Sequence, residues 1–216
     1  MLRFTERLID EGFSQRLVRE SDVAMIFKGT PASRYGLVNK ALKKGELIRL
    51  CRGVYVLAEK YRTIRLSKFH IAGQIVRLSF VTFESSLAYH GWIPERVETI
   101  ESAISLGRSR GFETPFGYFQ YTRLPTDPFH FLTGVVQRGD ETQTFLVAKP
   151  LRALVDLAYR SRQTDFTLRY VTEALRIDTN RLEQLTIEDF SSVAKVYKFT
   201  HVKRFLASLQ KELALS

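Results

Sequence analysis

The chain has 216 residues, of which 44% are hydrophobic and 26% are charged, and its formal net charge is +10. This length suits one large domain or two small ones, each with its own core. We expect a cytoplasmic protein without a membrane partner, because no apolar run approaches roughly 18 residues, the first residues lack a signal-peptide core, and one cysteine excludes an internal disulfide.

Positive charge is concentrated towards the N-terminus. Residues 28–65 hold ten Lys or Arg against only Glu46 and Glu59, whereas residues 66–216 hold 19 basic residues against 16 acidic ones. Such a basic module favours a polyanionic partner, most often nucleic acid. On charge alone, a basic surface that is merely solvated is an equally open interpretation.

Two helices are predicted within this basic region. The first ends near Phe27, and Ser21 is its expected cap. The second is expected to be capped by Ser33 and to end at Gly45. Its apolar stripe consists of Leu37, Val38, Ala41 and Leu42. Its outward side chains are Arg34, Tyr35, Asn39, Lys40 and Lys43.

A short hairpin follows, because two apolar runs at 47–50 and 54–57 are separated only by Cys51-Arg52-Gly53. Helix, turn, helix and basic hairpin is the order of a winged helix-turn-helix, which we assign to residues 1–65. The second helix would then lie in a DNA major groove, with the hairpin across the flanking backbone. The alternative is a small α/β cap whose basic residues only solvate it.

Arg34 and Asn39 suit guanine and adenine edges, and Arg49 and Arg52 suit phosphates. The predicted DNA-binding residues are Ser33, Arg34, Tyr35, Asn39, Lys40, Lys43, Lys44, Arg49 and Arg52.

The remaining residues, 66–216, are predicted to form a mixed α/β domain with a largely antiparallel sheet and a helical tail, so the fold class is α+β. Helices are expected at 66–78, 84–90 and from Pro150 to about 161, and again at 168–176, 187–197 and 202–213. Between Val97 and Val147 four strand-like segments alternate with turns. The domain boundary is expected within 58–68.

Motifs for catalysis are weak. The four histidines, His70, His90, His130 and His201, show no zinc-site spacing, and there is no GxxxxGK[ST] sequence. Acidic pairs such as Asp140-Glu141 are predicted to be solvated, not metal-binding. We therefore expect a non-catalytic chain without metal or cofactor. The aromatic residues between 112 and 131 fit a core, or alternatively a stacking platform for single strands.

Four segments together resemble AbiEi-type antitoxins, the transcription-regulating partners in type IV toxin–antitoxin (abortive infection) systems. These segments are ALKKGELIRLCRGVYVLA at 41–58, VTFESSLAYHGWIPE at 81–95, GRSRGFETPFGYFQY at 107–121 and VAKPLRALVDLAY at 147–159. Their order is more specific than any one of them, and the resemblance covers roughly residues 15–160. The family's Pro-Glu-Lys is replaced here by Pro150-Leu151-Arg152, so an acidic position is lost.

The resemblance implies an antitoxin that binds inverted repeats in its own promoter as double-stranded DNA and represses its operon. The C-terminal domain, 66–216, would counter a cognate nucleotidyltransferase toxin without a stable complex. Candidate residues of that domain are Arg108, Arg110, Lys149, Arg152 and Asp156. Asp156 is expected to pair with Arg152 or Arg160, one helical turn away.

Two other functions remain open from the sequence. One is a solitary winged-helix regulator whose second domain senses a ligand or a protein partner. The other is a DNA-processing enzyme that carries a winged helix as its targeting module.

Overall fold

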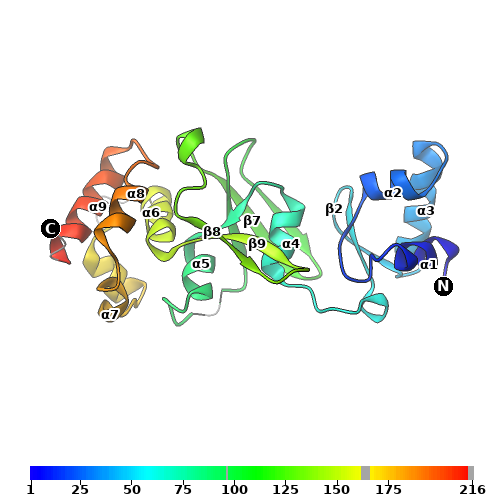
Figure 1. Cartoon of the computed structure of the whole chain (residues 1–216), viewed down its shortest axis with the longest axis horizontal. Coiled ribbons are helices and arrows are strands. Elements are labelled where there is room, and N and C mark those ends of the chain that lie inside the picture. Colours follow the sequence, from blue (N-terminus) through cyan, green and yellow to red (C-terminus); the bar gives the residue numbers. More distant parts are fainter. Residues whose placement is uncertain (96, 162–165, 214–216) are drawn as a thin grey trace.

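The computed structural model describes residues 1–95, 97–161 and 166–213. Three parts follow one another along the long axis of the molecule (Figure 1). A small helical part with its own sheet lies at the N-terminal end, a larger sheet lies in the middle, and a group of helices lies at the C-terminal end. No described helix combines the length and the apolar composition that a bilayer crossing would need.

The N-terminal part combines three helices with a three-stranded antiparallel sheet in the order β1-β3-β2. Its elements are α1 (Arg3–Asp10), β1 (Val18–Arg19), α2 (Glu20–Ile26), α3 (Pro31–Lys43), β2 (Leu47–Cys51) and β3 (Val54–Leu57). The predicted helix, helix and hairpin are therefore present. The predicted apolar stripe of α3 faces inward: Val38 and Ala41 are buried, and Leu37 and Leu42 pack against the same core.

Both predicted N-terminal caps in this part, Ser21 and Ser33, are wrong by a few residues. Helix α3 starts at Pro31, and Thr30 is its cap because its hydroxyl accepts a bond from the Ser33 amide at 3.2 Å. Proline suits a first helical position, since the amide it lacks would have no helical partner there. Helix α2 starts before Ser21, with the Asp22 carboxylate accepting from the Arg19 amide at 2.7 Å.

The middle part is a six-stranded sheet in the order β6-β7-β5-β4-β9-β8. The strands are β4 (Phe80–Val81), β5 (Ile100–Ile104), β6 (Arg110–Thr114), β7 (Gly117–Arg123), β8 (Val135–Gly139) and β9 (Thr144–Ala148). The expected antiparallel character holds for β6–β7, β8–β9 and β4–β5, but β5–β7 and β4–β9 are parallel. The sheet is therefore mixed, because its parallel pairs join segments that are not consecutive along the chain.

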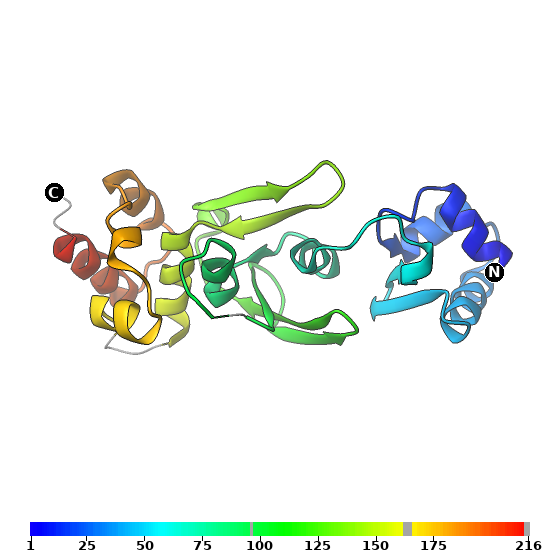
Figure 2. The ribbon, with the colours of Figure 1, turned by 90° about the horizontal axis from the view of Figure 1, so that it is seen from below.

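Helices cover both faces of this sheet (Figure 2). Helix α4 (Lys68–Ile75) packs on the face formed by Val81, Phe119 and Val147. The other face carries α5 (Phe83–Tyr89) and α6 (Pro150–Ser161). Helices α8 (Ile187–Val193) and α9 (Thr200–Glu212) pack outside α6. The helical tail consists of a π-helical turn (Tyr170–Ala174), α7 (Thr179–Leu182), α8 (Ile187–Val193) and α9 (Thr200–Glu212).

The N-terminal part shares an apolar cluster with the middle part. Leu17, Leu50 and Val56 belong to the same buried cluster as Ile71 of α4 and Phe119 of β7. A polar contact lies beside it, where the guanidinium of Arg19 donates to the backbone and side-chain oxygens of Gln74 at 2.6 and 2.9 Å. Side chains of the N-terminal sheet therefore hold this part against the middle part, in addition to the covalent link through residues 58–67.

Candidate nucleic-acid interface

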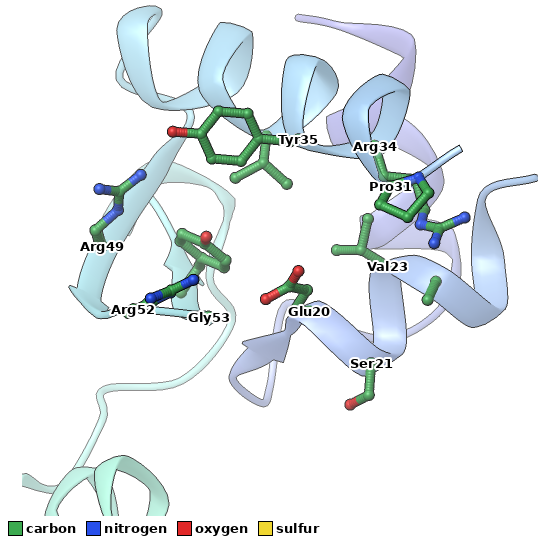
Figure 3. Close-up of a pocket in the computed structure, with 12 residues that line it drawn as sticks. Glu20, Ser21, Val23, Pro31, Arg34, Tyr35, Arg49, Arg52 and Gly53 are labelled. Carbon is green, nitrogen blue, oxygen red and sulfur yellow. The ribbon is translucent and has the colours of Figure 1, made fainter. Parts of the chain in front are cut away.

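A groove of about 690 Å³ opens between α2, α3 and the β2–β3 hairpin (Figure 3). Its lining combines cationic, aromatic and small apolar side chains from all three elements. The lining residues are Glu20, Ser21, Val23, Ala24, Pro31, Arg34, Tyr35, Val38, Arg49, Arg52, Gly53 and Tyr55. The structure thus brings Arg34, Tyr35, Arg49 and Arg52, four of the predicted DNA-binding residues, to one groove.

The hairpin contributes the most available cations. Arg49 on β2 and Arg52 at the turn are both exposed, and neither forms an ion pair with a described residue. The Arg49 guanidinium lies over the Tyr55 ring, 5.8 Å from its centre, in position for a cation–π contact. Gly53 allows the tight turn because its φ is +75°, a backbone conformation that other residues adopt only with strain.

Helix α3 presents the remaining candidates on different sides. Tyr35 is 61% exposed at the groove edge. Asn39 and Lys43 follow it at four-residue intervals and so continue the same face towards the helix end. Lys40 lies on another side of α3 and lines a separate pocket with Arg3 and Phe4 of α1.

Three further candidates differ in what surrounds them. Ser33 and Lys44 are exposed at the two ends of α3. Arg34 donates from its guanidinium to the Gly29 carbonyl in the α2–α3 turn. Figure 3 places its side chain on the opposite side of the groove from Arg49. Arg34 therefore fastens the turn in this conformation, and Asn39 is the more available side chain for reading a base edge.

Sequence reasoning did not predict the other eight lining residues as part of the site, and Glu20 and Tyr55 are the most informative of them. Tyr55 is only 5% exposed, yet its side chain forms part of the groove wall. Glu20 opens α2, and its amide donates to the Gly53 carbonyl at 3.0 Å, which ties the helix start to the hairpin turn. No local spacing in the sequence relates Glu20 to Gly53, because the contact forms only when the sheet is assembled.

In the C-terminal region, the structure places two candidates inside the core. Arg152 and Asp156 are both fully buried and form an ion pair at 2.8 Å. The Asp156 carboxylate also accepts from the hydroxyls of Tyr197 and Thr82 at 2.7 and 2.6 Å. Burial, with this carboxylate beside it, raises the pKa of the Tyr197 hydroxyl. The expected pairing of Asp156 with Arg152 is therefore present, and its burial removes both side chains from direct contact with a partner.

The other predicted residues of that region stay apart from this network. Arg108 is exposed just before β6, and Arg110 is exposed at its start. Lys149 is also exposed, and its Nζ lies 3.9 Å from Oδ1 of Asp189. The alternative partner of Asp156, Arg160, instead pairs with Glu84 and Glu101.

Chemistry-bearing groups are sparse in the described part of the chain. Within it, no three His, Cys, Asp or Glu side chains gather in a way that could hold a metal ion. The half-buried Cys51 lies on β2, and burial raises the pKa of its thiol, which lowers the fraction of nucleophilic thiolate. The aromatic residues of the strands divide as follows: Phe119 and Tyr121 are buried, and Tyr118 is 44% exposed.

Comparison with known proteins adds no further constraint to this geometry: no family model matches the chain, and no curated protein matches it significantly.

Proposed function

We propose that the chain is a sequence-specific DNA-binding regulator and that residues 1–65 act as a winged helix-turn-helix. In this proposal α3 is the recognition helix and the β2–β3 hairpin is the wing. One observation carries it: Tyr35 on α3 and the unpaired Arg49 and Arg52 on the hairpin border a single groove.

The three elements would divide the work of binding. Arg49 and Arg52 would contact phosphates, which supply affinity and register but little sequence information. Asn39 would read an adenine edge from the exposed face of α3, and Lys43 would add a backbone contact at the end of that helix. Arg34 supports this arrangement by holding the α2–α3 turn through Gly29.

The wider proposal is that this regulator is the antitoxin of a type IV toxin–antitoxin pair. It would repress its own operon at inverted repeats and would counter a nucleotidyltransferase toxin through the region that follows the winged helix. Support for the antitoxin role comes from the four resembling segments alone. The burial of Arg152 and Asp156 limits their part in it to shaping that region.

A solitary regulator that senses a ligand or partner through its C-terminal region is the second candidate. The apolar cluster that joins Leu50 and Val56 to α4 and the central sheet favours it. Through this contact, a change in the central sheet would reach the hairpin directly.

The test of DNA binding uses the full chain and a duplex from the region upstream of its own gene. Arg49→Ala and Arg52→Ala are each expected to reduce the salt dependence of log K by about 1, since each phosphate contact contributes about 0.9 to that slope. Asn39→Ala is expected to lose about 1–3 kcal/mol of base discrimination.

Lys211→Ala is the matched control, because it removes one positive charge from an exposed site on α9. Binding that ignores sequence, or equal effects of Lys211→Ala and Arg52→Ala, would contradict the proposed interface.

The antitoxin role is separable in the same variants. Co-expression with the adjacent gene is expected to show that Arg49→Ala/Arg52→Ala loses repression but still rescues growth. Absence of rescue by the wild-type chain would favour the solitary regulator.

A further inference from the structure

We infer that Glu20 is a specificity-determining residue of the groove, which selects DNA carrying an exocyclic amino group, cytosine N4 or adenine N6, opposite its carboxylate. This inference rests on the proposed DNA binding and adds to it which chemical groups of the duplex the groove accepts.

The carboxylate of Glu20 is held in place by the backbone. Glu20 is the first residue of α2, and its amide bond to the Gly53 carbonyl fixes the helix start against the hairpin turn. Its Oε2 lies close above Gly53, since a Cβ added at that glycine would be 3.3 Å from it. Figure 3 shows the carboxylate directed into the space between the hairpin and α3.

The charge of Glu20 is unusual for this location. It is the only acidic side chain among the described residues that line the groove, which otherwise carries Arg34, Arg49 and Arg52. Glu20 forms no ion pair with any described residue, so these arginines do not neutralise it within salt-bridge distance. An uncompensated carboxylate weakens the binding of every polyanion, whatever its sequence.

The Glu20 carboxylate favours DNA binding only where the duplex places a hydrogen-bond donor against it. An ionised carboxylate can only accept hydrogen bonds. In the major groove the donors are the amino groups of cytosine and adenine, whereas guanine O6 and thymine O4 are acceptors that a carboxylate repels. Glu20 would thus raise specificity mainly by disfavouring the wrong duplexes.

A purely structural role for Glu20 is the competing explanation, because an acidic residue in the first turn of a helix stabilises it. Glu6 offers a matched control, since it is an exposed acidic residue in the first turn of α1 and does not line the groove. Glu20→Ala and Glu6→Ala each remove one carboxylate from the first turn of a helix.

The experiment selects sequences from a randomised duplex library with the full chain, its Glu20→Ala variant and its Glu6→Ala variant. Alanine is used because a glutamine amide could itself bind adenine. Competition binding of the selected and a scrambled duplex follows. The wild type and Glu6→Ala are expected to enrich a position for cytosine or adenine, which becomes degenerate in Glu20→Ala. The ratio of selected to scrambled affinity is expected to fall roughly fivefold or more, the discrimination of one specific base contact, with scrambled duplex bound more tightly.

Three outcomes would overturn the inference. If Glu20→Ala keeps the wild-type preference, or if Glu6→Ala loses it equally, Glu20 does not select the bases. If the wild type enriches no sequence, the proposed function fails and the inference fails with it. Enrichment by the wild type that survives Glu20→Ala leaves the proposed function intact and refutes only the role of Glu20.

Discussion

Replacing Asp156 by Asn should destabilise the chain far more than an equivalent change at the surface. The substitution keeps the shape of the side chain but leaves the buried Arg152 guanidinium without its counter-charge. Arg152 also donates to the carbonyls of Phe131 and Thr133 at 3.0 and 2.6 Å, and its Nη2 has no hydrogen-bond partner among the described residues. The cation is therefore held in the core and cannot swing out to water.

The expected size of the effect follows from this burial. Removing one partner of a buried pair costs about 3–5 kcal/mol. For a chain of this length that corresponds to a fall of roughly 6–20 °C in Tm. Replacing both partners, as in Arg152→Met/Asp156→Leu, should cost less than the two single changes together, because no uncompensated charge is left behind.

Arg169 and Glu173 provide the internal control. They form a pair of the same i,i+4 spacing at 2.9 Å, but their side chains are 82% and 63% exposed. Glu173→Gln should therefore cost only about 0.3–0.5 kcal/mol. Urea unfolding of the full chain measures these variants. A cost for Asp156→Asn no larger than that for Glu173→Gln would refute the reasoning.

Two further predictions concern pH and backbone geometry. Burial, reinforced by Glu84, raises the pKa of Glu101 to about 7 from 4.5, so the folded chain holds a proton that the unfolded chain releases. Stability should then fall as pH rises from about 5 to 7, by at most about 1.4 kcal/mol per unit. Urea midpoints of Glu101→Gln should lose this slope, and its persistence would argue against the assignment. Gly139→Ala should lower Tm more than Gly107→Ala. Both glycines have positive φ, but only at Gly139 would the Cβ meet backbone, 1.9 Å from the Gln143 oxygen.

Local signals in the sequence predicted α2, α3 and the β2–β3 hairpin, but neither α1 nor strand β1. The apolar spacing of Val38 and Ala41 gives α3 its buried face, and Gly45, with φ +64°, ends it as expected. The hairpin around Gly53 follows from two short apolar runs and one turn. Such features depend on residues a few positions apart, so periodicity and turn chemistry suffice to predict them.

The error at the start of α3 arose where two residue types compete for one role. Ser33 was expected to cap α3, but Thr30 lies directly before Pro31 and accepts the bond from the Ser33 amide instead. Cap preferences are similar among these side chains, so the local sequence does not discriminate between them. The start of α2 differs for another reason: Arg19 is its N-cap residue, and the Asp22 carboxylate accepts from the Arg19 amide.

Sheet pairing and burial were decided at a longer range. Parallel pairing sets Val81 beside Val147, and no periodic pattern in either segment specifies that neighbour. The spacing of Arg152 and Asp156 predicts their ion pair, whereas its burial comes from the helices packed around α6.

By itself the sequence determined that residues 1–65, with their helix pair and hairpin, would carry most of the net positive charge. Only the tertiary structure decided which of those charges share a groove, and that Glu20 stands among them. The physical reason is that charge and periodicity are properties of neighbouring residues, whereas a groove is formed by backbones that meet after folding.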